Sequence, residues 1–157
     1  MANVVLEHVI LLPLLVLQIL FFPFATTLIT SSWEGARRQV ALEEAASHLG
    51  STIQQLYFSL SEEKICTGNI TQASKLPPTI EGHAYNATGS PMIPSNGSKI
   101  LTLSLVLEGT HETASVKVTL GPNAQWGGGT FRSNSPNACI KVQKRSYNVL
   151  RFYLEGG

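Results

Sequence analysis

Residues 9–28 read VILLPLLVLQILFFPFATTL, an apolar run that holds no charged side chain and a single amide, Gln18. In a helix, about twenty predominantly apolar residues match the thickness of the hydrocarbon core of a bilayer. A cleaved secretory signal has a shorter apolar region that follows basic residues, whereas no Lys or Arg precedes this run. We therefore expect residues 9–28 to form a membrane-spanning helix and not a secretory signal.

The helical pattern continues well beyond the apolar run. Apolar residues recur three or four positions apart, with one step of five, at Ala36, Val40, Ala45, Leu49, Ile53, Leu56 and Leu60. This spacing is typical of the apolar stripe of an amphipathic helix. We predict one helix over residues 3–62, about 90 Å long at about 1.5 Å per residue. Pro13 and Pro23 lie inside it and would bend or loosen it locally.

From about residue 64 the pattern changes from helical to alternating. Residues 99–107 and 113–120 predict one hairpin, and residues 138–144 and 147–154 predict another. Shorter candidate strands are residues 66–72, 79–85 and 130–132, with Gly127, Gly128 and Gly129 in a loop. We therefore predict an α+β chain in which the long helix precedes an antiparallel β-sandwich of immunoglobulin-like character.

Composition excludes several functional classes. The net charge of +1 offers no electrostatic case for a nucleic-acid partner. The chain holds no aspartate, its four histidines share no ligand-like spacing, and no nucleophile elbow is present. We expect no catalytic residue, no metal site and no cofactor, and hence no enzyme.

Three N-glycosylation sequons begin at Asn69, Asn86 and Asn96. They favour N-linked glycans and an extracytoplasmic C-terminal region. Arg37 and Arg38, which follow the apolar run, indicate the opposite orientation by the positive-inside rule. A basic leader that once preceded the apolar run would reconcile the two signals.

The chain has two cysteines, Cys66 and Cys139, both in the polar C-terminal region. Outside the cell they could form one disulfide that closes a long loop and contributes roughly 2–4 kcal/mol. Two free buried thiols are the alternative.

The combination of Glu7, the apolar run and its amphipathic continuation resembles the N-terminal half of archaeal type IV pilins. In that family a prepilin peptidase removes a short leader, and a glutamate stands five residues into the mature chain. The resemblance implies Asn3 as the first mature residue and Ala2 as the last leader residue. Met1 and Ala2 lack the basic residues of such leaders, so either the chain starts inside a longer precursor or the register differs.

The resemblance implies three regions: residues 1–2 as a leader remnant, 3–63 as the helix and 64–157 as an outer β domain. The helix would hold the subunit in the cytoplasmic membrane before assembly and pack with other copies in the core of an extracellular filament afterwards. Implied partners are copies of the chain, the prepilin peptidase and the assembly machinery, and the implied role is adhesion or surface attachment. Alternatives are a single-span anchored ectodomain or minor pilin that acts as an adhesin, and an archaellum-type subunit.

Overall fold

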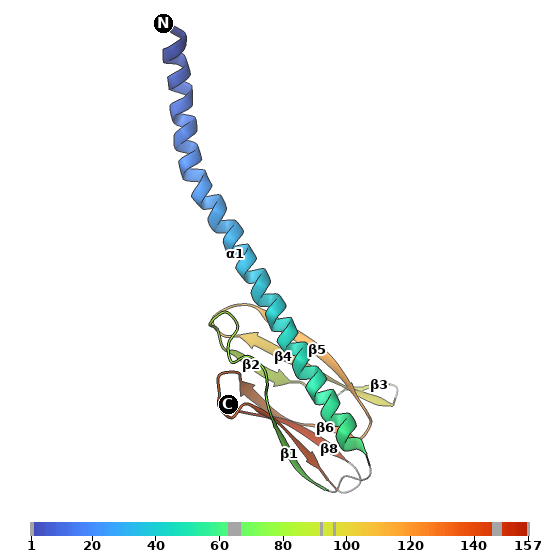
Figure 1. Ribbon diagram of the computed structural model, residues 1–157. Helices are drawn as coiled ribbons and strands as arrows, with labels where there is room; N and C mark the ends of the chain where they lie inside the picture. Colours follow the sequence, from blue (N-terminus) through green and yellow to red (C-terminus); the bar gives the residue numbers. More distant parts are fainter. Residues whose placement is uncertain (1, 63–66, 92, 96, 146–148, 157) are drawn as a thin grey trace. The chain divides into compact units, whose positions relative to one another are not determined.

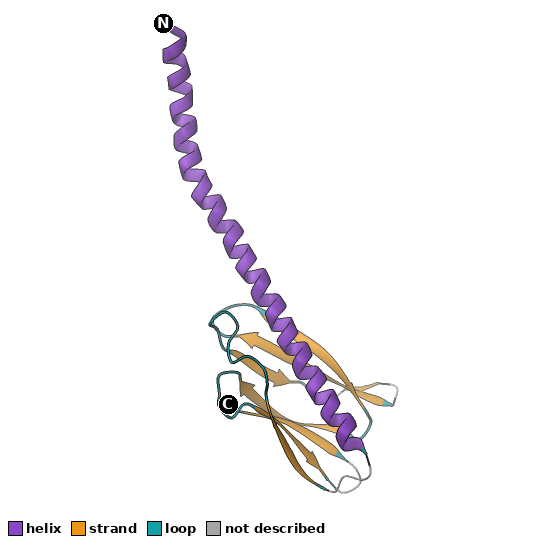
Figure 2. Cartoon of the chain, in the orientation of Figure 1, coloured by secondary structure: helices purple, strands orange, loops and turns teal. Residues whose placement is uncertain are grey.

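The computed structural model describes residues 2–62, 67–91, 93–95, 97–145 and 149–156. This part of the chain forms one long helix followed by strands, which confirms the α+β class with a long N-terminal helix (Figure 2). The elements are α1 (Ala2–Ser61), β1 (Gly68–Ala73), β2 (Tyr85–Gly89), β3 (Ile93–Ser95), β4 (Ser98–Leu107), β5 (Thr113–Leu120), β6 (Ala124–Arg132), β7 (Cys139–Lys144) and β8 (Leu150–Glu155).

Both predicted hairpins are present. β4 and β5 pair antiparallel from Lys99 opposite Leu120 to Val106 opposite Thr113. β7 and β8 pair antiparallel from Cys139 opposite Glu155 to Lys144 opposite Leu150. Because a short connection joins the strands of each pair, their periodicity and the turn between them predicted the pairing.

The sheet is mixed, so the prediction of exclusively antiparallel strands is wrong. The described strands follow the hydrogen-bonded order β1-β7-β8-β6-β2-β4-β3, and β5 pairs with β4 (Figure 1). β6 and β8 run parallel, with Ala124 opposite Leu150. An immunoglobulin-like sandwich is not confirmed. The parallel pair joins strands that are distant in sequence, which local periodicity cannot predict.

The glycine triplet Gly127–Gly129 lies inside β6 and not in a loop, which corrects the sequence prediction. The register of β6 against β8 shifts between Trp126 and Gly128. A Cβ atom at Gly127 would lie 2.2 Å from Cε1 of Tyr153. Gly129 has a φ of +104°, and a Cβ there would lie 2.1 Å from the carbonyl oxygen of Leu154. The glycines therefore let β8 approach β6 across a bulge.

The short strand candidate at residues 79–85 is also wrong for most of its length. Only an isolated bridge between Ile80 and His83 forms there, and β2 begins at Tyr85. Glu81 and Gly82, between the bridged residues, both have positive φ angles of 48° and 84°. This tight turn replaces an extended strand.

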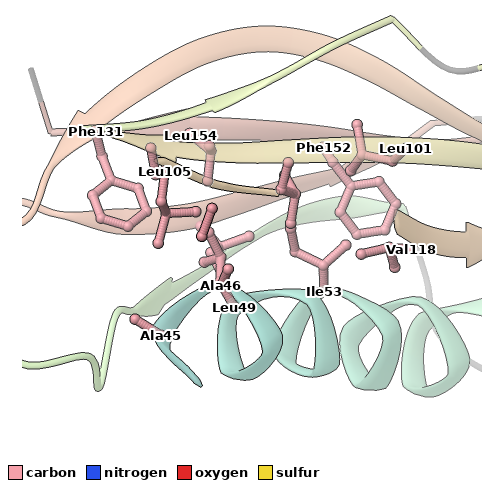
Figure 3. Packing of buried hydrophobic residues seen from close by; sticks show 14 of the residues in the cluster. Ala45, Ala46, Leu49, Ile53, Leu101, Leu105, Val118, Phe131, Phe152 and Leu154 are labelled. Carbon is pink, nitrogen blue, oxygen red and sulfur yellow. The ribbon is translucent and has the colours of Figure 1, made fainter. Parts of the chain in front are cut away.

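The second half of α1 completes the hydrophobic core of the β domain. Figure 3 shows Ala45, Ala46, Leu49 and Ile53 facing the side chains of the sheet. The buried helix residues are Leu42, Ala45, Ala46, Leu49, Ile53, Tyr57 and Leu60. Two residues of the predicted stripe, Ala36 and Val40, are exposed, because the core packing on the helix begins at Ala41.

The chain divides into two compact units, residues 1–37 and residues 38–157. The division falls within α1 and not at its end, because the helix residues after Arg38 belong to the core described above. Residues 38–157 therefore hold a complete core of helix and sheet. The first unit is the N-terminal part of the helix alone.

Candidate functional site: an exposed apolar helix segment

The N-terminal unit presents a long apolar surface. Within residues 9–29, every large hydrophobic side chain is at least 50% exposed, and Phe22 reaches 77%. A soluble monomer rarely exposes a contiguous apolar patch of more than a few hundred Å². This segment therefore requires an apolar environment, which lipid or other protein chains can supply.

The hydroxyl groups at the end of this segment are satisfied within the helix itself. The Oγ1 atoms of Thr26, Thr27 and Thr30 donate to the carbonyl oxygens four residues earlier, at 2.8, 2.8 and 2.9 Å. Ser31 Oγ donates to the carbonyl oxygen of Leu28 at 3.0 Å. Burying an unpaired hydroxyl in an apolar medium is costly. These internal bonds make the segment compatible with lipid or with a dry helix interface.

By length and composition, α1 can cross a membrane: its most apolar stretch has a mean hydropathy of 2.4 and is not buried within the protein. The apolar character that the sequence indicated for this stretch of α1 is thus confirmed. Trp33, 72% exposed, follows the apolar residues. Tryptophan is enriched where a helix leaves the hydrocarbon core of a bilayer.

Two exposed apolar side chains lie farther along the helix, within the second unit. Val40 and Phe58 are 64% and 61% exposed. They stand about five turns apart, so they lie on the same face of the helix. That face is opposite the buried stripe around Leu49, because the angular offset per residue is about 100°. Val40 belongs to the apolar stripe predicted from the sequence, whereas Phe58 was not part of that prediction.

The predicted processing residues lie in the first turns of α1. The structure describes the backbone of Ala2, Asn3 and Glu7 as helical but not their side chains. A role for Ala2 and Asn3 in cleavage, and for Glu7 in assembly, stays a prediction.

Two of the three sequons lie in described strands with different surroundings. Asn69 is exposed in β1, whereas Asn86 is half-buried in β2. The Nδ2 atom of Asn86 donates to Oε1 of Glu108 at 3.0 Å. Asn96 lies outside the described residues.

Cys139 is half-buried at the start of β7 and forms no disulfide with another described residue. Desolvation raises the pKa of this thiol, so at neutral pH it is protonated and weakly nucleophilic. Cys66 lies outside the described residues, and its pairing with Cys139 stays a prediction.

Glu108 organises a polar cluster that the sequence analysis missed. Its carboxylate accepts hydrogen bonds from Asn86 and from Arg132. These bonds, led by that from Arg132, lower the pKa of Glu108. Its carbonyl oxygen also lies 3.0 Å from Nδ1 of His83. The three partners come from the turn before β2, from β2 and from β6, so only the sheet pairing brings them together.

Among the described residues, no group of three or more His, Cys, Asp or Glu side chains gathers as a metal site would require. Comparisons with models of protein families, with curated proteins and with solved structures find no match to this chain. The exposed apolar helix segment is therefore the candidate functional site.

Proposed function

We propose that this chain is a structural subunit of an extracellular filament, similar to an archaeal type IV pilin, that polymerises through α1 and serves adhesion or surface attachment. One observation carries the proposal: the apolar side chains of residues 9–29 are exposed, while residues 38–157 hold a complete core without them. The N-terminal segment is thus free to change its environment without any loss of core packing in the β domain.

The proposal accounts for both environments of the segment. Before assembly, lipid surrounds residues 9–29, which have the length and hydropathy of a span. After assembly, the same side chains pack against those of other copies, and each buried Å² of apolar surface contributes about 25 cal/mol. Helical stacking of many copies buries such a segment along its whole length.

Val40 and Phe58 are compatible with lateral packing in a filament, although single exposed apolar side chains also occur on monomers. Both residues lie in the second unit and follow the apolar segment in sequence, and both are more than 60% exposed. An anchored monomer would leave these side chains in water. Lateral packing with a second copy would cover them.

The alternative is a single-span anchored ectodomain or a minor pilin that acts as an adhesin. The length of the apolar segment supports this alternative equally well, because one bilayer span explains it. An archaellum-type subunit would share the helix and β domain but would imply rotation and motility.

Filaments sheared from cells that produce the chain test the proposal. Negative-stain images with mass spectrometry of the subunits should identify this chain as the main component. A chain that stays in the membrane fraction, and is missing from every sheared filament, would contradict the major-subunit role and support the anchored alternative. The same spectra give the mature N-terminus, expected at Asn3.

Two matched variants sharpen the experiment. Leu15→Arg puts a charge into the apolar segment, where Leu15 is 55% exposed, and should abolish filaments. Ile93→Arg changes an apolar residue of β3 that is 66% exposed and should leave filaments intact. Filaments formed by Leu15→Arg would show that the segment is not the assembly surface.

A further inference from the structure

We propose that, of the two sequons in described strands, Asn69 carries an N-linked glycan on the folded protein and Asn86 does not. The inference rests on the proposed function in one respect, because both sequons must lie outside the cell. The inference distinguishes two sequons that match the same sequence motif.

The strands that hold the two sequons differ in their position in the sheet. β1 stands at the end of the hydrogen-bonded order, and Asn69 pairs with Gln143 of β7 alone. Asn86 lies in a strand that is paired on both sides, opposite Val106 of β4 and Arg132 of β6. Moving Asn69 out of the sheet to reach a transferase breaks backbone hydrogen bonds to one neighbouring strand, whereas moving Asn86 breaks those to two.

The residues beside the two asparagines also differ in burial. Asn69 and Thr71 are exposed, as are Gly68 and Ile70 beside them in β1. Asn86 stands between Tyr85 and Ala87, both 0% exposed in the core. Moving the second sequon out of the sheet would therefore expose core side chains, whereas every residue of the first sequon is already exposed.

The side chains of the second sequon make hydrogen bonds within the fold. Asn86 Nδ2 donates to Glu108, whose carboxylate also accepts from Arg132. The hydroxyl of Thr88, which completes that sequon, donates to the carbonyl oxygen of Ser104 at 3.4 Å. Both functional groups of the second sequon are thus engaged inside the fold.

The transfer itself requires an accessible amide nitrogen. Nδ2 of Asn69 attacks the anomeric carbon of an oligosaccharide that is esterified to a lipid phosphate or diphosphate. The new C–N bond forms as the bond from that carbon to the phosphate oxygen breaks, and the oxygen leaves with the electron pair on the lipid phosphate. The amide nitrogen gives up one proton to a base of the transferase. Asn69, exposed on an edge strand, offers this nitrogen without disturbing the core.

Mass spectrometry of peptides from the full chain, purified from its own cells, tests the proposal. The peptide with Asn69 should carry a sugar mass at high occupancy, and the peptide with Asn86 should be unmodified. A modified Asn86, or an unmodified Asn69, would overturn the inference. Glycosylation of Asn69 on a chain that is missing from filaments would support the inference and contradict the filament role.

Threonine variants give a control that does not remove either asparagine. Thr71→Val destroys the first sequon and should remove the sugar mass from the Asn69 peptide. Thr88→Val destroys the second sequon and should leave the total sugar mass unchanged. A loss of sugar mass in Thr88→Val would overturn the proposal even if Asn86 peptides escape detection.

Discussion

The ammonium group of Lys144, at the end of β7, donates a hydrogen bond of 2.7 Å to the carbonyl oxygen of Leu60, in the last turn of α1. A second bond of 2.8 Å reaches the carbonyl oxygen of Glu62. The last carbonyls of a helix have no partner within the helix and attract cations. Lys144 is 7% exposed, so it satisfies these groups from inside the protein and ties the end of the helix to the sheet.

Lys144→Met should therefore destabilise the β domain by about 2–3 kcal/mol, because it removes charge-assisted hydrogen bonds and keeps the apolar stem. Urea denaturation of the full chain in detergent, followed by near-UV circular dichroism, measures the loss. Lys117→Met, at an exposed position of β5, is the control and should change stability by less than about 0.5 kcal/mol. Equal effects of the two changes would show that the contact with Leu60 contributes nothing.

A second prediction concerns the buried residues of α1. Leu49→Ala should cost about 2–5 kcal/mol, because Leu49 is 1% exposed and the change leaves a cavity in the core. Val40→Ala, at a residue that is 64% exposed, should leave the unfolding of the monomer unchanged. A large effect of Val40→Ala in detergent-solubilised monomer would contradict the described position of the stripe.

A third prediction concerns the glycines of β6. Gly129→Ala should destabilise the fold by about 2–4 kcal/mol, because its φ is positive and the new Cβ would overlap the backbone of Leu154. Gly68→Ala is the control, since no atom lies within 4 Å of the added Cβ. Thermal unfolding of both variants measures the difference, and similar midpoints would argue against the bulge.

A fourth prediction concerns the division of the chain into two units. A chain that starts at Arg38 should fold and remain monomeric in water, because its core uses no residue before Ala41. Circular dichroism and size-exclusion chromatography check both properties. Aggregation or loss of β structure would mean that residues 1–37 are needed for folding.

Acid should weaken the cluster around Glu108. The pKa of Glu108 is lower in the folded chain than in the unfolded chain, chiefly through its bond with Arg132. The cluster therefore stabilises the fold above the ordinary glutamate pKa of about 4.3 and loses this effect as pH falls through the lower, folded value. Glu108→Gln should show a shallower loss of stability in this acid range, measured by the urea midpoint at several pH values.

Glu44→Gln, exposed on the helix, is the control for that experiment. It should follow the pH dependence of the unaltered chain. If Glu108→Gln follows the same curve as Glu44→Gln, the cluster does not contribute to acid sensitivity.

The sequence alone determined the features that depend on near neighbours in the chain. A charge-free apolar run and helical spacing predicted one helix, which the structure gives as Ala2–Ser61. Alternation and short connections predicted the β4–β5 and β7–β8 hairpins. Both kinds of signal are local, because helix and hairpin hydrogen bonds join residues that are close in sequence.

Only the tertiary structure decided which distant residues meet. The parallel pairing of β6 with β8 and the strand path through the glycine triplet depend on pairing between strands that are not consecutive in the sequence. The contacts of Lys144 with the helix end and of Glu108 with Arg132 depend on the same long-range folding. The sequence predicted the apolar N-terminal segment. It did not show that this segment contributes no side chain to the described core. Burial depends on what packs against a helix, and only the sheet determines that this packing begins at Ala41.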